Sequence, residues 1–191
     1  MGIKQTLDVL NAMEADGAIG RYAIAGAVAA YNYVEPAPTE DLDIIIAFET
    51  GPVNTVSGLV SLEPIYTYLK QKGFATHRKE GILIGDWLVQ FLPVASELDQ
   101  EALAQAEEVE LDAGGKSSVR TRVLRPEHIV ATCLRVGRPK DLIRISQFLS
   151  ESAVNIPALC GVISRHGLQD SWRLFCARTG SVDPCTFGGA R

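Results

Sequence analysis

The stretch TEDLDIIIAF (residues 39–48) decides the fold, because two acidic residues open an apolar run that is rich in isoleucine. A continuous apolar run of this length is typical of a central β-strand that is covered on both faces. Side chains alternate along a strand with a period of two, so Asp41 and Asp43 are expected on the same face. The sequence therefore predicts two neighbouring carboxylates at the start of a buried strand.

Two carboxylates directed at one point repel each other unless a cation lies between them. Mg²⁺ is bound in proteins through carboxylate oxygens, and Mn²⁺ accepts the same ligands. We therefore predict that Asp41 and Asp43 hold Mg²⁺ or Mn²⁺. The alternative is that both acids lie at an exposed strand end, where they are solvated or paired with arginine.

The preceding stretch, YAIAGAVAA (residues 22–30), is typical of a short strand, a tight turn at Gly26 and a helix of small residues. A glycine at such a turn lets backbone amides and a helix N-terminus approach a phosphate closely. The alternative is that Gly26 only allows the helix to pack against the sheet.

The rest of the chain predicts a mixed order of strands and helices, which favours an α/β or α+β core. A hairpin is expected around Gly85-Asp86, and the C-terminal part is expected to be helical with a loose tail from about residue 179. The remaining predicted strands are 82–84, 87–92 and two edge strands, 108–111 and 119–123, and the remaining predicted helices are 4–16, 62–72, 97–106, 126–136, 141–149, 156–165 and 168–177.

The composition is that of a globular protein, with 191 residues, 47% hydrophobic and 21% charged. This length suits one compact domain with a helical appendage. No apolar run approaches a secretory signal or a membrane span, so we expect a cytoplasmic protein without a membrane partner. The cysteines form no C-x-x-C pair, and we interpret them as reduced and mostly buried thiols; they are Cys133, Cys160, Cys176 and Cys185.

The charged residues are unevenly distributed along the chain, although the net charge is −5. Residues 97–112 carry acids and no base, whereas residues 116–144 are strongly basic. The basic stretch could meet phosphate, or it could be a solvated surface balanced by the acidic one. An RNA-binding module is a further hypothesis, which the overall acidity and the lack of clustered aromatic residues disfavour.

Two motifs resemble the nucleotidyltransferase superfamily. The runs YAIAGA (22–27) and TEDLD (39–43) are similar to its glycine-containing turn and its Asp-x-Asp strand, and LRVGRPKDL (134–142) resembles the Arg-x-Lys-Asp segment of the branch that contains abortive-infection, type IV toxin-like nucleotidyltransferases. The resemblance covers about residues 20–150. It implies a mixed β-sheet flanked by helices in residues 1–125 and a helical region in residues 126–191.

The resemblance also implies a metal-dependent activity in which a nucleoside triphosphate donates a nucleotidyl group to an acceptor. Asp41 and Asp43 would be its catalytic and metal-binding residues, and the acceptor would be a protein, a small molecule or RNA. Arg138 and Lys140 would contact phosphates or brace the site, and Asp141 would orient one of these cations. The alternative is that the three residues form a surface salt-bridge cluster at the start of a helix. The full set of implied nucleotide-binding residues is Gly26, Ala27, Thr39, Arg138, Lys140 and Asp141.

The sequence departs from the family pattern where a third carboxylate is usual, because the strand at residues 87–92 carries Gln90 there. An amide brings no charge and cannot act as a base, and Asp86, at the hairpin turn, is no obvious replacement. Three further positions differ from the family pattern. Cys133 stands where a lysine is typical, Arg144 where an acid is typical, and Ala27 where a serine or a second glycine is typical. Impaired activity is therefore expected, and the alternative function is a non-catalytic nucleotide-binding or protein-interaction member of the same fold.

Overall fold

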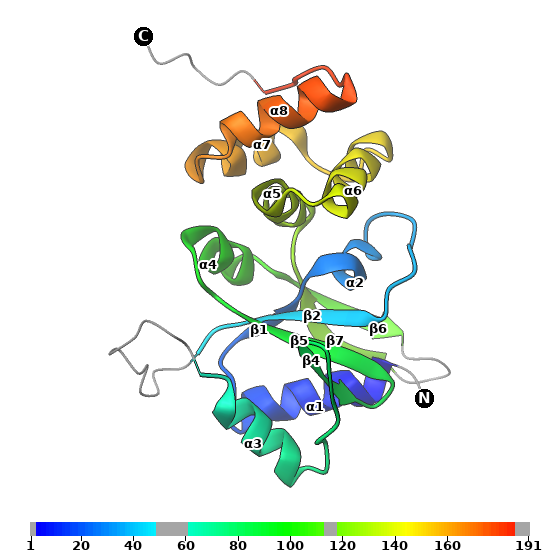
Figure 1. Cartoon of the computed structure of the whole chain (residues 1–191), viewed down its shortest axis with the longest axis vertical. Helices are drawn as coiled ribbons and strands as arrows, with labels where there is room; N and C mark the ends of the chain where they lie inside the picture. Colours follow the sequence, from blue (N-terminus) through cyan, green and yellow to red (C-terminus); the bar gives the residue numbers. More distant parts are fainter. Residues whose placement is uncertain (1–2, 49–60, 113–117, 186–191) are drawn as a thin grey trace. The chain divides into compact units, whose positions relative to one another are not determined.

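The computed structural model describes residues 3–48, 61–112 and 118–185, which form a seven-stranded mixed sheet flanked by helices (Figure 1). The predicted α/β fold class is confirmed. No helix among these residues is both long and apolar enough to cross a membrane. In chain order the elements are α1 Ile3–Ala15, β1 Tyr22–Ile24, α2 Gly26–Ala30, β2 Asp41–Ile46, α3 Glu63–Gln71, β3 His77–Arg78, β4 Gly81–Ile84, β5 Trp87–Pro93, α4 Glu97–Ala104, β6 Glu107–Asp112, β7 Ser118–Val123, α5 Pro126–Val136, α6 Pro139–Ser150, α7 Ile156–Arg165 and α8 Gln169–Thr179.

The strand that carries the two acids lies at the centre of the sheet, whose order is β3-β4-β5-β2-β1-β7-β6. β2 pairs with β5 in parallel and with β1 antiparallel. Leu42, Ile44 and Ile46 are completely buried, as expected for one face of a covered central strand. The opposite face of β2 carries Asp41 and Asp43, which are half-buried.

Two strand predictions differ from the structure. The strand at 119–123 was expected at an edge, but β7 lies inside the sheet, between β1 and β6. Its alternation of exposed and buried residues resembles an edge strand because one face of β7 remains exposed. β3, His77–Arg78, was not predicted, since two exposed residues carry no periodic pattern.

The chain divides into two compact units. The α/β unit comprises Met1–Val28 and Ala37–Leu124, and the helical unit comprises Ala29–Pro36 and Arg125–Arg191. Within the α/β unit, α1 and α3 cover one face of the sheet, and α4 covers the other (Figure 1). Asp41 and Asp43 lie on the face opposite Leu42, Ile44 and Ile46, and share it with the buried Ile45.

The helical unit is built around α5, which packs against α6, α7 and α8. Pro126 opens α5, and Gly137, in the left-handed conformation at φ +69°, ends it. The α7 helix is capped by Asn155, whose side chain accepts a hydrogen bond of 3.0 Å from the backbone N–H of Ala158. Buried aromatic residues fill the core, with Trp172 and Phe175 stacked at 5.6 Å between ring centroids.

Residues 29–36 belong to the helical unit although both flanking segments belong to the α/β unit. Gln147 of α6 donates a hydrogen bond of 2.9 Å to the backbone oxygen of Glu35, whose N–H donates to Glu151 at 3.0 Å. The rings of Tyr33 and Phe148 also meet, with 6.3 Å between their centroids. These contacts attach the short segment to α6.

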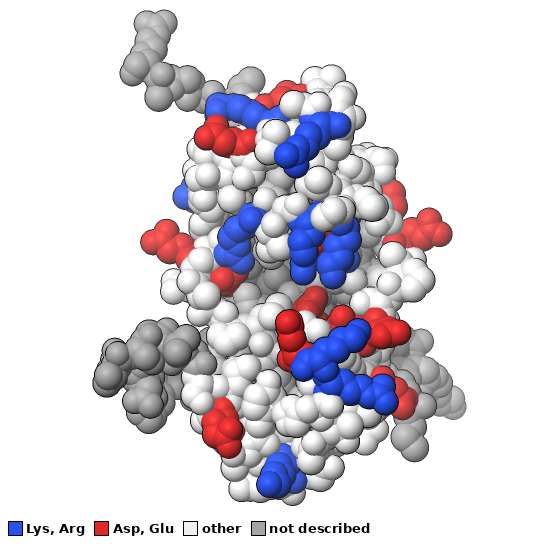
Figure 2. All heavy atoms as spheres, viewed as in Figure 1, with Lys and Arg blue, Asp and Glu red and all other residues white. Residues whose placement is uncertain are grey.

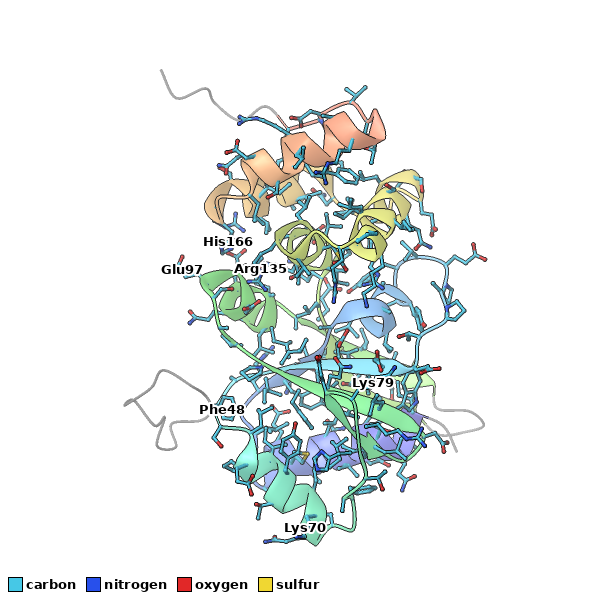
Figure 3. The ribbon with its side chains drawn as sticks, in the orientation of Figure 1. Phe48, Lys70, Lys79, Glu97, Arg135 and His166 are labelled. Atoms are coloured by element: carbon cyan, nitrogen blue, oxygen red, sulfur yellow. A yellow bond between two sulfur atoms is a disulfide. The ribbon has the colours of Figure 1, made fainter. Side chains whose placement is uncertain are left out.

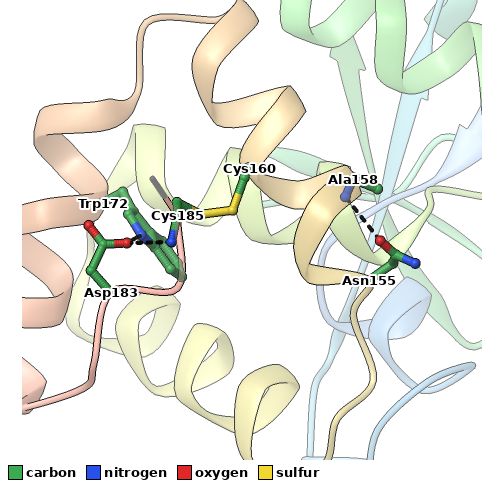
Figure 4. Close-up of a disulfide and its surroundings, with 6 residues drawn as sticks. All are labelled: Asn155, Ala158, Cys160, Trp172, Asp183 and Cys185. Atoms are coloured by element: carbon green, nitrogen blue, oxygen red, sulfur yellow. Dashed lines mark hydrogen bonds between the residues drawn. A yellow bond between two sulfur atoms is a disulfide. The ribbon is translucent and has the colours of Figure 1, made fainter. Parts of the chain in front are cut away.

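A disulfide joins Cys160 of α7 to Cys185 across 25 residues of sequence (Figure 4). The prediction that all four cysteines are reduced is therefore wrong for this pair, and Cys133 and Cys176 are free and buried. Such a separation follows no short sequence motif, because only the packing of α7 and α8 brings the two Cα atoms to 5.5 Å. Next to the bond, Asp183 accepts hydrogen bonds from the Trp172 indole and from the N–H of Cys185.

Reduction of the disulfide should lower the free energy of unfolding of the helical unit by roughly 3 kcal/mol, because closing a loop of this length restricts the unfolded chain. Thermal or urea unfolding with and without a thiol reductant measures the effect. The double variant Cys160→Ala/Cys185→Ala is the control and should not respond to reductant. An equal response in parent and control, or no response in the parent, would contradict the assignment.

Candidate functional site

Asp41 and Asp43 lie on one face of β2, as the period of two requires. The two side chains are half-buried, and Leu42 between them is completely buried on the opposite face. The pair is therefore held at the central strand of the sheet, open to solvent on one side only.

Gly26 packs directly against the Asp43 side chain. Its φ is +61°, which favours glycine, and the backbone N–H of the preceding Ala25 donates a 2.8 Å hydrogen bond to the Asp43 backbone oxygen. A Cβ placed on Gly26 would overlap the Asp43 carboxylate oxygen and would lie 2.9 Å from its Cγ. The turn therefore approaches the carboxylate more closely than any side chain at position 26 allows, and Ala27 follows it at the start of α2.

Gln90 is the cross-strand partner of Asp43 in the parallel pairing of β5 with β2. Paired residues point to the same face, and adjacent strands are roughly 4.8 Å apart, so Gln90 lies beside Asp43 on the face that carries the two carboxylates. Asp86 lies instead in the turn between β4 and β5. Within residues 3–48, 61–112 and 118–185, no group of three or more His, Cys, Asp or Glu residues could hold a metal ion.

The site still fits a hard divalent cation. Oδ1 of Asp41 is buried, and no residue that the structure describes gives it a hydrogen bond. A buried carboxylate oxygen without a donor costs free energy, and an ion such as Mg²⁺ satisfies it. Asp41 and Asp43 supply two negative ligands, and the Gln90 amide can add one neutral oxygen.

A groove of about 700 Å³ opens beside this site within the α/β unit. Its lining includes Thr39, whose hydroxyl lies 3.4 Å from the backbone N–H of Asp41. Of the lining residues, the sequence predicted only Thr39 as a site residue and set Asp86 aside. The residues of β3, β4 and β5 were missed because they come together only through the pairing of these strands. The full lining is Thr39, Glu40, Arg78, Lys79, Leu83, Asp86, Trp87 and Leu88.

The two tryptophans have different environments. Trp172 is completely buried in the core of the helical unit. Trp87 is only half-buried and lines the groove.

The remaining predicted residues form a cluster at the start of α6, in the helical unit. Asp141 is 1% exposed and accepts hydrogen bonds from the Arg138 backbone N–H at 3.1 Å and from its guanidinium at 2.8 and 3.1 Å. Asp141 therefore orients Arg138, while Lys140 is exposed. Gly26, Thr39, Asp41, Asp43 and Gln90 belong to the other unit.

Cys133, where a lysine is typical of the resembled branch, is a buried thiol in α5. Burial raises the pKa of its thiol to about 11, although the neighbouring Arg144 opposes this shift. The exposed cations of the basic stretch are Arg120, Arg125, Arg135, Arg138 and Lys140, and Lys116 lies outside the described residues. Figure 2 shows Lys and Arg side chains gathered on the helical part of the viewed face.

The comparisons with known proteins support the fold. No protein-family model matches the chain. No curated protein matches it either. Among solved structures, the chain is similar to an antigenic nucleotidyltransferase-like protein from Paracoccidioides brasiliensis, with 16% identity over 95% of this chain and 94% of that chain and a TM-score of 0.50. It is also similar to the antibiotic-resistance factor ANT(2'')-Ia, with 17% identity over 94% and 95% of the two chains and a TM-score of 0.43.

The structural likeness supports the predicted nucleotidyltransferase-type architecture: a mixed sheet flanked by helices, with a helical C-terminal part. Neither similar structure is described as an abortive-infection toxin, so that branch of the superfamily stays a prediction.

Proposed function

We propose that the protein binds a nucleoside triphosphate with Mg²⁺ or Mn²⁺ at the face of β2 and transfers its nucleotidyl group slowly to an acceptor. The observation that carries the proposal is the buried Oδ1 of Asp41, to which no described residue gives a hydrogen bond, beside Asp43, which contacts the turn at Gly26. Asp41 and Asp43 hold the ion, and a phosphate group of the nucleotide lies beside them at the turn that Gly26 forms.

When bound, the metal ion neutralises the triphosphate and aligns the attacking and leaving oxygens. In the reaction an acceptor hydroxyl oxygen forms a bond to the α-phosphorus, the bond from this phosphorus to the bridging oxygen breaks, and pyrophosphate leaves. Gln90 cannot take the hydroxyl proton, which is released to water. The missing base and the missing third charge are the reasons for a slow reaction.

The nucleotide contacts of Ala27, Thr39, Arg138 and Lys140 are part of this proposal. Thr39 precedes the acids on the chain and offers a hydroxyl. The Nε and Nη2 groups of Arg138 donate to the buried Asp141, which fixes the orientation of the guanidinium that contacts a phosphate in this proposal. The cytoplasmic location is likewise proposed on the sequence alone.

A second candidate is a non-catalytic member of the same fold that binds nucleotide or a protein partner. The neutral Gln90 favours it, since the described residues offer no cluster of three charged or imidazole ligands. Incubation with each α-labelled nucleoside triphosphate, metal ion and cell extract separates the two candidates. Transfer of label supports the enzyme, whereas binding without transfer supports the second candidate.

Substitution of Asp41 by Asn should abolish most of the stabilisation that Mg²⁺ and nucleotide give, while leaving the metal-free protein as stable as the parent or up to about 1 kcal/mol more stable. Removing one of two neighbouring negative charges weakens metal binding and relieves their repulsion. Thermal unfolding with and without Mg²⁺ and nucleotide measures both effects. Asp8→Asn, at an exposed position on α1, is the control and should behave as the parent; equal metal-dependent stabilisation in the Asp41 variant would contradict the site.

A further inference from the structure

The groove next to Asp41 is a continuation of the acidic face of the sheet. Asp41 pairs with Leu88 of β5, Leu88 pairs with Leu83 of β4, and Gly81, two residues before Leu83, pairs with Arg78 of β3. Paired residues and residues two apart share a face, so these side chains lie on the face of Asp41. Three interstrand steps of roughly 4.8 Å place the β3 backbone about 14 Å from β2.

The floor of the groove is apolar and its rim is charged. Leu83 and Leu88 form the floor, and the half-buried Trp87 also lines the groove. Leu88 packs closely over Gly81, since a Cβ at position 81 would lie 2.7 Å from the backbone oxygen of Val89 and 3.0 Å from the Leu88 side chain. A groove of about 700 Å³ with these walls has the size and character of a small-molecule site.

The cations of the rim are not equivalent. Lys79 faces Glu40 at 3.9 Å, and both side chains are largely exposed, at 70% and 88%. Arg78 forms no side-chain hydrogen bond and no ion pair with any residue of the described ranges. A guanidinium offers a planar fork of donors that matches the two oxygens of a carboxylate or a phosphate. Figure 3 labels Lys79, which lies close to the strands, and Figure 2 shows acidic and basic side chains next to each other on this part of the α/β unit.

We propose that this groove binds the acceptor, and that the acceptor is a small hydroxylated molecule with one oxyanion, a carboxylate or a phosphate, held by Arg78. The inference rests on the proposed transfer function. The carbon skeleton lies on Leu83, Leu88 and Trp87, and Thr39 and Glu40 at the start of β2 hydrogen bond to its hydroxyl groups.

The order of the strands supports this role. The Gly26 turn follows β1, on one side of β2, and the groove lies over β5, β4 and β3, on the other side. Transfer to an acceptor proceeds in line, with the attacking oxygen and the leaving pyrophosphate on opposite sides of the phosphorus. A triphosphate at Gly26 and an acceptor in the groove meet this condition, with Asp41 and Asp43 between them.

Binding is tested without metal or nucleotide, so that the result does not depend on the transfer reaction. Glycerate is the carboxylate probe, glycerol 3-phosphate is the phosphate probe, and glycerol is the probe without an oxyanion. All three titrations are carried out at the same ionic strength. The chain has two tryptophans, and Trp172 is completely buried, so a change in fluorescence that is lost in Trp87→Phe reports on the groove.

We expect a saturable change with one or both oxyanion probes and none with glycerol. Arg78→Ala should weaken the apparent affinity by about tenfold or more, and Arg78→Lys should weaken it less, because lysine keeps the charge but loses the fork. Arg120→Ala, at an exposed position on β7 outside the groove, should bind as the parent does.

Equal affinity in Arg78→Ala and parent, or no response of Trp87 to either oxyanion probe, would overturn the inference. The inference is also overturned if the nucleotide label is transferred only to material that a dialysis membrane retains, because the acceptor is then a macromolecule. The proposed function fails separately, if Mg²⁺ and nucleotide stabilise the Asp41→Asn variant and the parent equally. The two failures are therefore distinguishable in the same set of proteins.

Discussion

Replacement of Gln90 by Glu should raise the affinity for Mg²⁺ or Mn²⁺ and increase nucleotidyl transfer by roughly two to four orders of magnitude. Gln90 pairs with Asp43 on the face that carries the two acids, so a carboxylate there adds a third negative ligand to the site. It also supplies a base for the acceptor hydroxyl, which the amide cannot do. Metal titration by calorimetry and the release of pyrophosphate from each nucleoside triphosphate measure the two effects.

Gln100→Glu is the matched control, because it adds the same charge at an exposed position of α4. The control should change neither metal affinity nor transfer. In the absence of metal, the Gln90 variant should be less stable than the parent, since three acids then crowd one face. A parent that already transfers nucleotides at about 1 s⁻¹ or faster would show that Gln90 does not impair the site.

Substitution of Gly26 by Ala should lower the free energy of unfolding by roughly 3–5 kcal/mol and abolish nucleotide binding. A Cβ at this position overlaps the Asp43 carboxylate, and the residue has a φ of +61°, which alanine adopts only with strain. The carboxylate or the turn must move, and either movement destroys the close approach on which the phosphate site depends. Urea unfolding and binding of Mg²⁺ and nucleotide are the measurements.

Gly17→Ala separates the two causes. Gly17 has a similar φ of +70°, but a Cβ there meets nothing within 4 Å. This control should show only the strain of about 1–2 kcal/mol and should bind nucleotide as the parent does. If Gly26→Ala loses no more stability than Gly17→Ala and still binds nucleotide, the turn is not in contact with the site.

The sequence predicted those features that depend on local periodicity. The strand period alone placed Asp41 and Asp43 on one face, and the turn at Gly26 was expected from a glycine between a strand and a run of small residues. Gln90 was identified as the neutral residue of the neighbouring strand, and the parallel register places it beside Asp43. The structure added the contact between Gly26 and the Asp43 carboxylate.

Features that depend on long-range pairing could not be predicted in the same way. The groove needs the register of β3, β4 and β5, and Arg78 belongs to a strand of two exposed residues without any pattern. The bond between Cys160 and Cys185 depends on the packing of α7 and α8. In both cases the residues are distant in sequence and become neighbours only in the folded chain.

The attachment of residues 29–36 to α6 means that no single cut of the polypeptide separates the two units. The chain passes between them at residues 28–29, 36–37 and 124–125. A gene fragment that ends at residue 124 would still encode this segment but not Gln147, Phe148 and Glu151, its partners in the helical unit. The two units therefore alternate along the gene. Recombination that exchanges only the C-terminal part of the gene leaves one segment of the helical unit behind, because residues 29–36 are encoded between the Gly26 turn and the acidic strand.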